Sequence, residues 1–319
     1  MRLRKDRRKC VNRSLAAFTL AFLLFATSAS ATAQLPVILI YGFQPVPGFR
    51  ATEIWATFAE ELSGNDIQNA ESISVPNDHE FYLLSATDDD HRDVILSNPA
   101  SPIEPTVRDI MVYVRRFAAE IATLSAQRSM TRFDIVAHSM GGLIARAYIE
   151  SHDLEGDVGF AYGGEIRTLV MLATPNHGSE VASLGEWFST LSRQLAPGSE
   201  FLATLNELRW IDGTVTVINP SVRYVSLAGQ TCLGCGLRFD VDACRQACVD
   251  EGLAWHGSDL VVTMPSAYLP DAENCAAIGY DHIAMHADPG LAAVVAGILS
   301  GSTAPAVVYA DGYDTYRRP

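Results

Sequence analysis

The sequence predicts an α/β fold, in which helices cover both faces of a mostly parallel sheet. The first observation is a set of short apolar runs, such as residues 35–41 (LPVILIY), that are typical of strands buried on both faces. The second is that stretches with apolar residues at helical spacing lie between these runs. Because parallel strands need a long crossover, usually a helix, this alternation favours a parallel sheet.

Each element follows from its local pattern. Apolar runs predict strands at residues 35–41, 81–85, 133–137, 166–172, 224–228 and 260–263. Helices are expected at residues 51–62, 106–126, 141–150, 183–208 and 290–299. The clearest of them is 106–126, where Ile110, Val114 and Phe117 recur on one face. Residues 86–105 are expected to form a loop.

Residues 1–33 have the three-part layout of a secretory signal peptide. Seven Lys or Arg side chains within the first 13 residues precede an apolar run at 15–26 and a small-residue cleavage site, Ala31-Thr32-Ala33. The run is shorter than the roughly 20 residues that span a bilayer, although an uncleaved N-terminal anchor is the alternative. We therefore expect a secreted protein, extracellular or periplasmic, with residues 34–319 as a single domain and no membrane span after cleavage.

The charge balance excludes one class of partner. The chain has 23 Lys+Arg and 37 Asp+Glu, and the leader holds seven of the former and one of the latter, which leaves a formal charge of −20 after cleavage. Nucleic-acid binding needs clustered basic side chains, so we expect no nucleic-acid partner. Anionic lipid headgroups should also repel such a chain. The charge identifies no substrate and no oligomeric state.

The stretch RFDIVAHSMGGLIARAYIE (132–150) contains a candidate nucleophile. An apolar strand pattern stops at Ala137, Ser139 follows, and two glycines precede a helical pattern. This strand–turn–helix arrangement is typical of a nucleophile elbow, although Ala137 replaces the first glycine of G-x-S-x-G. The helix N-terminus would place backbone N–H groups beside a developing oxyanion. An ordinary strand–loop–helix connection is the alternative interpretation.

A serine nucleophile in this architecture needs a carboxylate and then a histidine later in the chain. We expect His282, just before the last helix, to be the base; His286, four residues on, is its rival. His177 follows Ser139 too soon for the usual position of the base, and a structural loop histidine is the preferred interpretation.

The expected carboxylate is Asp259, which adjoins the apolar run 260–262 in a loop context. Its competitors are Asp271, Glu273 and Asp281. Asp281 is next to His282, and neighbouring side chains in an extended chain point apart, so it is a poor orienting group. A plain surface charge is the alternative for Asp259.

These residues lie in segments that resemble the secreted bacterial lipases of the α/β-hydrolase superfamily, including the lipase class 2 group. The matching segments are PVILIYGF (36–43), DIVAHSMGG (134–142), LVMLATPNHGS (169–179) and GSDLVVTMPSAYLPDAEN (257–274). The A-x-S-x-G turn is similar to that of the small Bacillus-type lipases. Several motifs in the right order are more specific than one alone.

The resemblance implies an α/β-hydrolase fold and a catalytic triad of Ser139, His282 and Asp259 that hydrolyses esters through an acyl-enzyme. Carried over by position, the oxyanion hole would use the backbone N–H groups of Phe43 and Met140. The family usually has histidine where Tyr41 stands here, which leaves the support of that loop open. The resemblance implies no cofactor and no metal, and it implies lipid degradation at a lipid interface.

Five cysteines follow the leader. Four of them, Cys232, Cys235, Cys244 and Cys248, lie in an insertion at about residues 230–256. In an exported protein we expect disulfides rather than a zinc site, with the fifth residue, Cys275, as the partner for a pairing outside the cluster.

On this reasoning, the expected activity is that of a triacylglycerol lipase. The alternatives are a short-chain or polymer esterase, an acyltransferase, and a non-catalytic binding protein on a hydrolase scaffold. Residues 183–208 form either a mobile lid or an ordinary cap helix.

Overall fold

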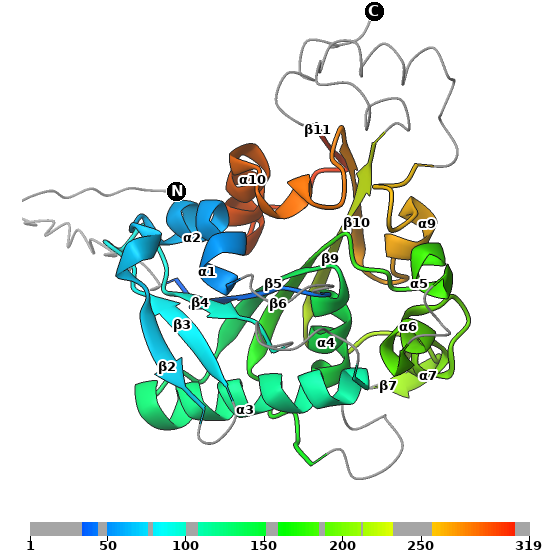
Figure 1. Cartoon of the computed structure of the whole chain (residues 1–319), viewed down its shortest axis with the longest axis horizontal. Coiled ribbons are helices and arrows are strands. Elements are labelled where there is room, and N and C mark those ends of the chain that lie inside the picture. Colours follow the sequence, from blue (N-terminus) through cyan, green and yellow to red (C-terminus); the bar gives the residue numbers. More distant parts are fainter. Residues whose placement is uncertain are drawn as a thin grey trace, which may run out of the picture. The chain divides into compact units, whose positions relative to one another are not determined.

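A nine-stranded sheet lies at the centre of the described part of the chain (Figure 1). The structure is a computed structural model that describes residues 34–43, 50–75, 79–99, 108–150, 159–184, 189–211, 213–231 and 257–309. The strand order is β11-β10-β9-β6-β5-β1-β4-β3-β2. Each strand is parallel to its neighbours except β3, which is antiparallel to both β2 and β4. The mostly parallel sheet expected from the sequence is confirmed.

The strands are short, as expected for a sheet of this kind. Their bounds are β1 Val37–Ile40, β2 Glu71–Ser74, β3 Glu80–Leu84, β4 Val94–Ser97, β5 Phe133–His138, β6 Ile166–Leu172, β9 Arg223–Gln230, β10 Glu273–Ile278 and β11 Val307–Tyr309. A separate antiparallel hairpin pairs β7 (Arg209–Ile211) with β8 (Thr214–Thr216).

Helices cover both faces of the sheet. One face carries α1 (Ala51–Ile54), α2 (Ala56–Ser63) and α10 (Pro289–Leu299), and the other carries α3 (Ile110–Arg128) and α4 (Met140–Ile149). Strand β1 shows why its sequence is apolar throughout. Val37 and Leu39 belong to the core on the α10 side, whereas Ile38 and Ile40 belong to the core on the α3 side. All four side chains are fully buried.

In the described connections lie four short helices and two 3₁₀ turns. They are α5 (Glu180–Leu184), α6 (Thr190–Leu195), α7 (Glu200–Leu205), α9 (Met264–Ala267), η1 (Ile67–Asn69) and η3 (Ala284–His286). Side-chain caps start several of these elements; Ser189 and Ser199, for instance, cap α6 and α7 by accepting a backbone N–H. Among the described residues, no helix combines the length and the apolar character that crossing a membrane requires.

Two predictions about elements were wrong in part. Residues 86–105 are not all loop, because Val94–Ser97 forms β4, the parallel neighbour of β1. Residues 260–263 are a turn rather than a strand. The helical material expected at 183–208 consists, in its described part, of the end of α5 and of α6 and α7, after which the chain enters β7. In that region Leu191, Leu195, Leu202 and Leu205 are buried.

The leader at residues 1–33 and the four clustered cysteines lie outside the described residues. Cys275 is described, and it is a free thiol in β10 with no exposed surface. The expectation that Cys275 forms a pairing outside the cluster is therefore wrong. Burial raises the pKa of this thiol to about 11, which leaves it protonated near neutral pH.

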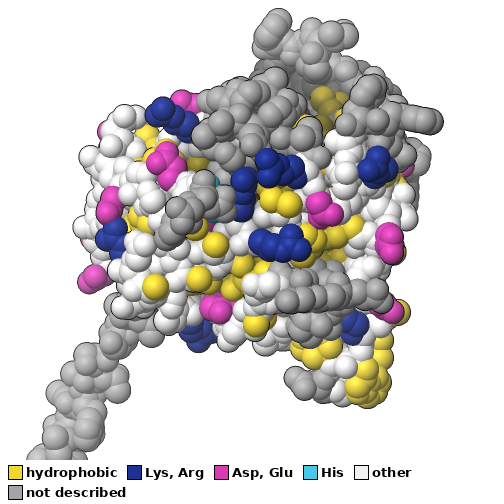
Figure 2. All heavy atoms as spheres, turned by 60° about the horizontal axis from the view of Figure 1, so that its bottom comes forward, with side chains coloured by type: hydrophobic (Ala, Val, Ile, Leu, Met, Phe, Trp, Pro, Cys, Tyr) yellow, Lys and Arg dark blue, Asp and Glu magenta, His cyan; other side chains and the backbone are white. Residues whose placement is uncertain are grey.

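The surface on the α3 side has no single sign of charge. Basic and acidic side chains are interspersed there among hydrophobic ones (Figure 2). Several of the basic groups on the chain are paired, as in the ion pair of Arg128 with Glu71.

Candidate active site

Ser139 lies at a strained turn between β5 and α4. Its backbone has φ 55° and ψ −131°, in a region that residues with a side chain rarely adopt. The glycines around it explain how the turn fits. A Cβ on Gly141 would lie 2.6 Å from the carbonyl oxygen of Ile40, and one on Gly42 would lie 2.7 Å from the backbone nitrogen of Met140. The carboxyl ends of β1 and β5 are therefore in main-chain contact.

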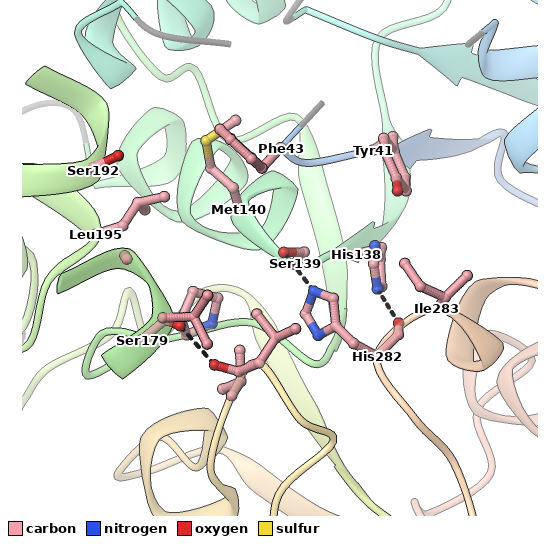
Figure 3. A pocket seen from close by; sticks show the side chains of 15 residues that line it. Tyr41, Phe43, His138, Ser139, Met140, Ser179, Ser192, Leu195, His282 and Ile283 are labelled. Atoms are coloured by element: carbon pink, nitrogen blue, oxygen red, sulfur yellow. Dashed lines mark hydrogen bonds between the residues drawn. The ribbon is translucent and has the colours of Figure 1, made fainter. Parts of the chain in front are cut away.

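Three side chains form a hydrogen-bonded chain that starts at Ser139. The Oγ of Ser139 is 2.9 Å from Nε2 of His282, and Nδ1 of His282 is 2.7 Å from Oδ2 of Asp259 (Figure 3 shows the first contact). Ser139 and His282 are each 8% exposed, and Asp259 is fully buried. The structure thus brings together the serine, the histidine and the carboxylate that the sequence suggests, from positions 143 and 23 residues apart.

A tight turn after β9 holds Asp259. Its Oδ1 accepts the backbone N–H groups of Val261 (2.9 Å) and Val262 (2.6 Å). Leu260 has φ 81°, which turns the chain back on itself and prevents the strand expected here. The carbonyl of Asp259 also accepts the backbone N–H of His282 at 3.0 Å. The aspartate therefore contacts both the ring and the main chain of the histidine.

The rival histidines lie elsewhere. His286 packs edge-on against Trp55 and Tyr41, and burial lowers its pKa to about 4. His177 is exposed on a loop and borders a second cavity, away from the Ser139 Oγ contact. It is His282, not His286 or His177, that reaches Ser139.

In the part of the chain that the structure describes, the three other candidate carboxylates, Asp271, Glu273 and Asp281, are not bonded to the His282 ring. Glu273 forms an ion pair with Arg223, and Asp281 accepts the backbone N–H groups of Ile283 and Ala284. Asp271 is exposed at a turn with φ 66°. Of the four candidate carboxylates, only Asp259 contacts His282 through its side chain within the described residues.

Phe43 and Met140 line the same cavity as Ser139. Met140 is the first residue of α4, so its N–H lies at the positive end of the helix. Within the described residues, neither the N–H of Phe43 nor that of Met140 donates a hydrogen bond.

The cavity in front of Ser139 has a volume of about 420 Å³. No Asp, Glu, Lys or Arg is among the described residues that line it. Its apolar wall consists of Phe43, Met140, Pro175, Val181, Ala182, Leu195, Val261, Val262 and Ile283. Figure 3 shows Leu195 and Ser192 of α6 on one side of Ser139 and Ile283 on the other. The site therefore favours an uncharged, apolar group.

A buried arginine supports one wall and was missed by the sequence reasoning. Arg146 on α4 has no exposed surface, and its guanidinium donates to the side chains of Asn176 and Asn206 at 3.0 Å each and to the carbonyl of Leu205 at 3.1 Å. Burial lowers its pKa to about 10, so it stays cationic at neutral pH. An arginine within an otherwise apolar helix is the sequence signal that indicates such an anchor.

Comparisons with known proteins address the fold. A family profile described as a domain of unknown function, DUF7379, matches residues 113–234, less than half of the chain. No curated protein sequence matches the chain. Lipase BlEst2 from Bacillus licheniformis, in its propeptide form, is a structural neighbour with 16% identity and a TM-score of 0.53, over 86% of this chain and 52% of that one. The fold is that of the α/β-hydrolases.

Two further solved structures agree. The lin2722 gene product of Listeria innocua has 17% identity and a TM-score of 0.50, over 87% of this chain and 99% of that one. Phospholipase PlaB from Legionella pneumophila has 19% identity and a TM-score of 0.51, over 85% of this chain and 60% of that one. The chain thus spans only about half of the BlEst2 propeptide form and three fifths of PlaB. The α/β-hydrolase fold predicted from the sequence is confirmed.

Proposed function

We propose that this protein is a serine carboxylic-ester hydrolase. The observation that carries the proposal is the hydrogen-bonded chain from Ser139 through His282 to Asp259, at the edge of an apolar cavity. A buried serine, histidine and aspartate with these contacts on an α/β-hydrolase scaffold are the parts that acyl transfer requires. The three neighbours reported above include proteins named lipase and phospholipase, which is consistent with this chemistry.

The hydrogen bonds assign the proton positions. Asp259 is an acceptor, so the proton of the neutral His282 ring is on Nδ1 and the lone pair on Nε2 faces Ser139 Oγ. As Oγ attacks the ester carbonyl, Nε2 takes its proton, and Asp259 stabilises the resulting imidazolium. The imidazolium then protonates the departing alcohol, which leaves an acyl-enzyme. Water, activated by the same nitrogen, releases the acid.

The backbone N–H groups of Phe43 and Met140 form the proposed oxyanion hole. Their place in the cavity wall beside Ser139 supports this assignment, as does the close main-chain contact of Gly42 with Met140. A donor of this kind is typically worth about 2.7–4 kcal/mol in transition-state stabilisation. Because the donors are main-chain groups, Tyr41 can occupy the position before Gly42 without removing one of them.

Within this class, we propose a secreted lipase related to the small Bacillus-type enzymes, with triacylglycerol as substrate. The uncharged apolar cavity supports an aliphatic acyl group, and the A-x-S-x-G turn and the leader pattern support the kinship and the secretion. Helices α6 and α7 lie at the place expected for a lid, and their buried leucines connect them to the core. Movement of this segment over the cavity is part of the lipase proposal.

A serine-reactive fluorophosphonate tests the enzyme proposal. The folded protein should be labelled at Ser139, and Ser139→Ala should abolish labelling while it leaves the melting temperature nearly unchanged. Absence of labelling in the folded wild-type protein refutes the proposal and favours a binding protein on a hydrolase scaffold.

Substrate preference is a separate measurement. Hydrolysis rates on p-nitrophenyl esters of rising acyl length, followed by emulsified triacylglycerol, distinguish a lipase from a short-chain esterase. A lipase should prefer long chains and act on the emulsion. A rate maximum at acetate or butyrate with no activity on the emulsion refutes the lipase proposal and retains the esterase.

A further inference from the structure

His138, the residue before the nucleophile, makes a contact that the proposed mechanism does not use. It is the last residue of β5, it is 1% exposed, and its Nε2 lies 2.7 Å from the main-chain carbonyl oxygen of His282. Figure 3 shows this bond beside the bond between Ser139 and His282. The two contacts start from the adjacent residues His138 and Ser139, and both end on His282.

The direction of this hydrogen bond follows from its chemistry. A carbonyl oxygen only accepts, so Nε2 of His138 donates, and Nδ1 of the neutral ring is left unprotonated. In the described part of the chain, that Nδ1 has no hydrogen-bond partner although it is buried. Burial also holds the pKa of His138 well below its usual range, so the ring is neutral.

An unpartnered buried nitrogen is unfavourable, and an apolar ring of the same shape would avoid it. An imidazole at this buried place therefore indicates a use for its Nε2–H. Tyr41 restricts how the ring lies, since it stacks on His138 with centroids 5.3 Å apart and an interplanar angle of 18°. The tyrosine of the sequence YGF, which stands where the resembled family usually has histidine, therefore packs on the residue before Ser139.

Within the described residues, three hydrogen bonds hold His282 besides the one between its Nε2 and Ser139 Oγ. Asp259 accepts both its backbone N–H and its Nδ1–H, and His138 donates to its carbonyl. The first two contacts fix the histidine to the turn that contains Asp259. Only the third fixes its main chain to the strand that carries the nucleophile.

We infer that His138 is a positioning residue. Its Nε2–H bonds the main-chain carbonyl of His282, and because His138 directly precedes Ser139, this bond sets the separation of Ser139 and His282. The inference rests on the proposed function, because the separation matters to proton transfer between Oγ and Nε2. A displacement of about 1 Å between reacting groups can cost roughly 100-fold in rate. Loss of the hydrogen bond from His138 to the His282 carbonyl should therefore lower kcat and leave substrate binding, measured by KM, almost unchanged.

The experiment compares variants with and without a donor at this place. His138→Phe keeps a ring but removes the donor, and we expect kcat to fall about tenfold or more with less than a twofold change in KM. His138→Gln offers an amide N–H at the same number of bonds from Cα and should recover most of the lost rate. His138→Met, with the length of glutamine and no donor, should behave like His138→Phe and replaces it if that variant does not fold. His286→Phe alters a ring that packs on His138 and should keep kcat within about twofold.

A resting-state measurement separates this inference from the proposed function. The Nδ1–H of His282, bonded to Asp259, should give a downfield proton NMR signal that sharpens with a fixed ring. We expect the signal in the wild-type protein and in His138→Gln, and a broadened or shifted signal in His138→Met. If the wild-type protein neither hydrolyses esters nor reacts with fluorophosphonate, the proposed function fails. The NMR signal still tests whether the bond from His138 to the His282 carbonyl fixes the His282 ring.

Two results overturn the inference. One is wild-type kcat and an unchanged signal in a folded His138→Met or His138→Phe. The other is an equal loss of kcat in His138→Gln and His138→Met at equal melting temperatures, which assigns the loss to packing alone.

Discussion

Replacement of Asp259 by asparagine should nearly abolish activity without unfolding the protein. The Oδ1 atom accepts two backbone N–H groups, from Val261 and Val262, so in Asp259→Asn the amide oxygen must take that place. The amide NH₂ then faces Nδ1 of His282, 2.7 Å from the replaced oxygen, and Nδ1 has to become an acceptor. The neutral ring consequently carries its proton on Nε2, where it can no longer accept the proton of Ser139.

The expected magnitude follows from the wrong tautomer. A loss of about 10⁴-fold in kcat, equivalent to about 5.4 kcal/mol of barrier, is typical of this replacement in a serine triad. The assay is kcat on a p-nitrophenyl ester, with the melting temperature measured on the same preparation. Because both backbone N–H groups keep an acceptor, the melting temperature should fall by only a few degrees.

Asp281→Asn is the matched control. Asp281 adjoins His282 in the chain, but it is exposed and its Oδ1 accepts the N–H groups of Ile283 and Ala284. This variant should keep kcat within about threefold, since the asparagine oxygen can accept the same two bonds. Retention of more than a tenth of wild-type kcat in Asp259→Asn would sink the assignment of the acid. A larger loss in Asp281→Asn than in Asp259→Asn would move that role to the neighbour.

Three further outcomes are expected. His282→Ala should lower kcat by about 10⁴-fold or more, whereas His286→Ala should lower it by less than about tenfold; ester hydrolysis checks both, and the reverse order would make His286 the base. Gly142→Ala should destabilise the fold by about 1–3 kcal/mol in urea unfolding, because its Cβ would lie 2.0 Å from Oγ1 of Thr174. Adding Thr174→Ala removes Oγ1 and Cγ2 but leaves the Cβ of residue 174 at 2.8 Å, so it should recover part of that loss, and no recovery would show that the clash is not the cause. Stability should also fall by about 2 kcal/mol between pH 7 and pH 5 through His286 alone, because its folded pKa of about 4 lies below the unfolded value and the unfolded chain binds the proton first. Urea titrations at both pH values should show a smaller fall in His286→Phe, and equal falls in the two proteins would contradict the assignment.

The centre of the sheet was predictable because its strands are buried on both faces. Strands β1, β5 and β6 pair side by side, and most of their residues are apolar and buried. Strand β4 was missed because only four residues, Val94–Ser97, follow an Asp-rich turn, and their pairing with β1 is a long-range contact. Strand β10 (ENCAAI) was missed because its small residues carry little β-propensity.

The candidate site residues could be predicted where a recognisable sequence pattern lies next to them. Asp259 was selected for its place beside an apolar run, but that run is apolar for another reason. Val261 and Val262 line the cavity, and the run bends around the carboxylate instead of entering the sheet. The role inferred for His138 depends on a carbonyl 144 residues away, and local pattern contains no such information.

The turn that holds Asp259 has a consequence for any attempt to change the shape of the cavity in front of Ser139. The two valines that line the cavity in front of Ser139 are the same residues whose main-chain N–H groups hold Asp259. A substitution there that shifts the backbone of the turn changes the cavity wall and the bonds to Asp259 together, whereas one that leaves the backbone in place changes the wall alone. Leu195 and Ser192 border the same cavity from α6, a separate segment. Variation at that wall offers a way to reshape the cavity while Ser139, His282 and Asp259 keep their mutual contacts.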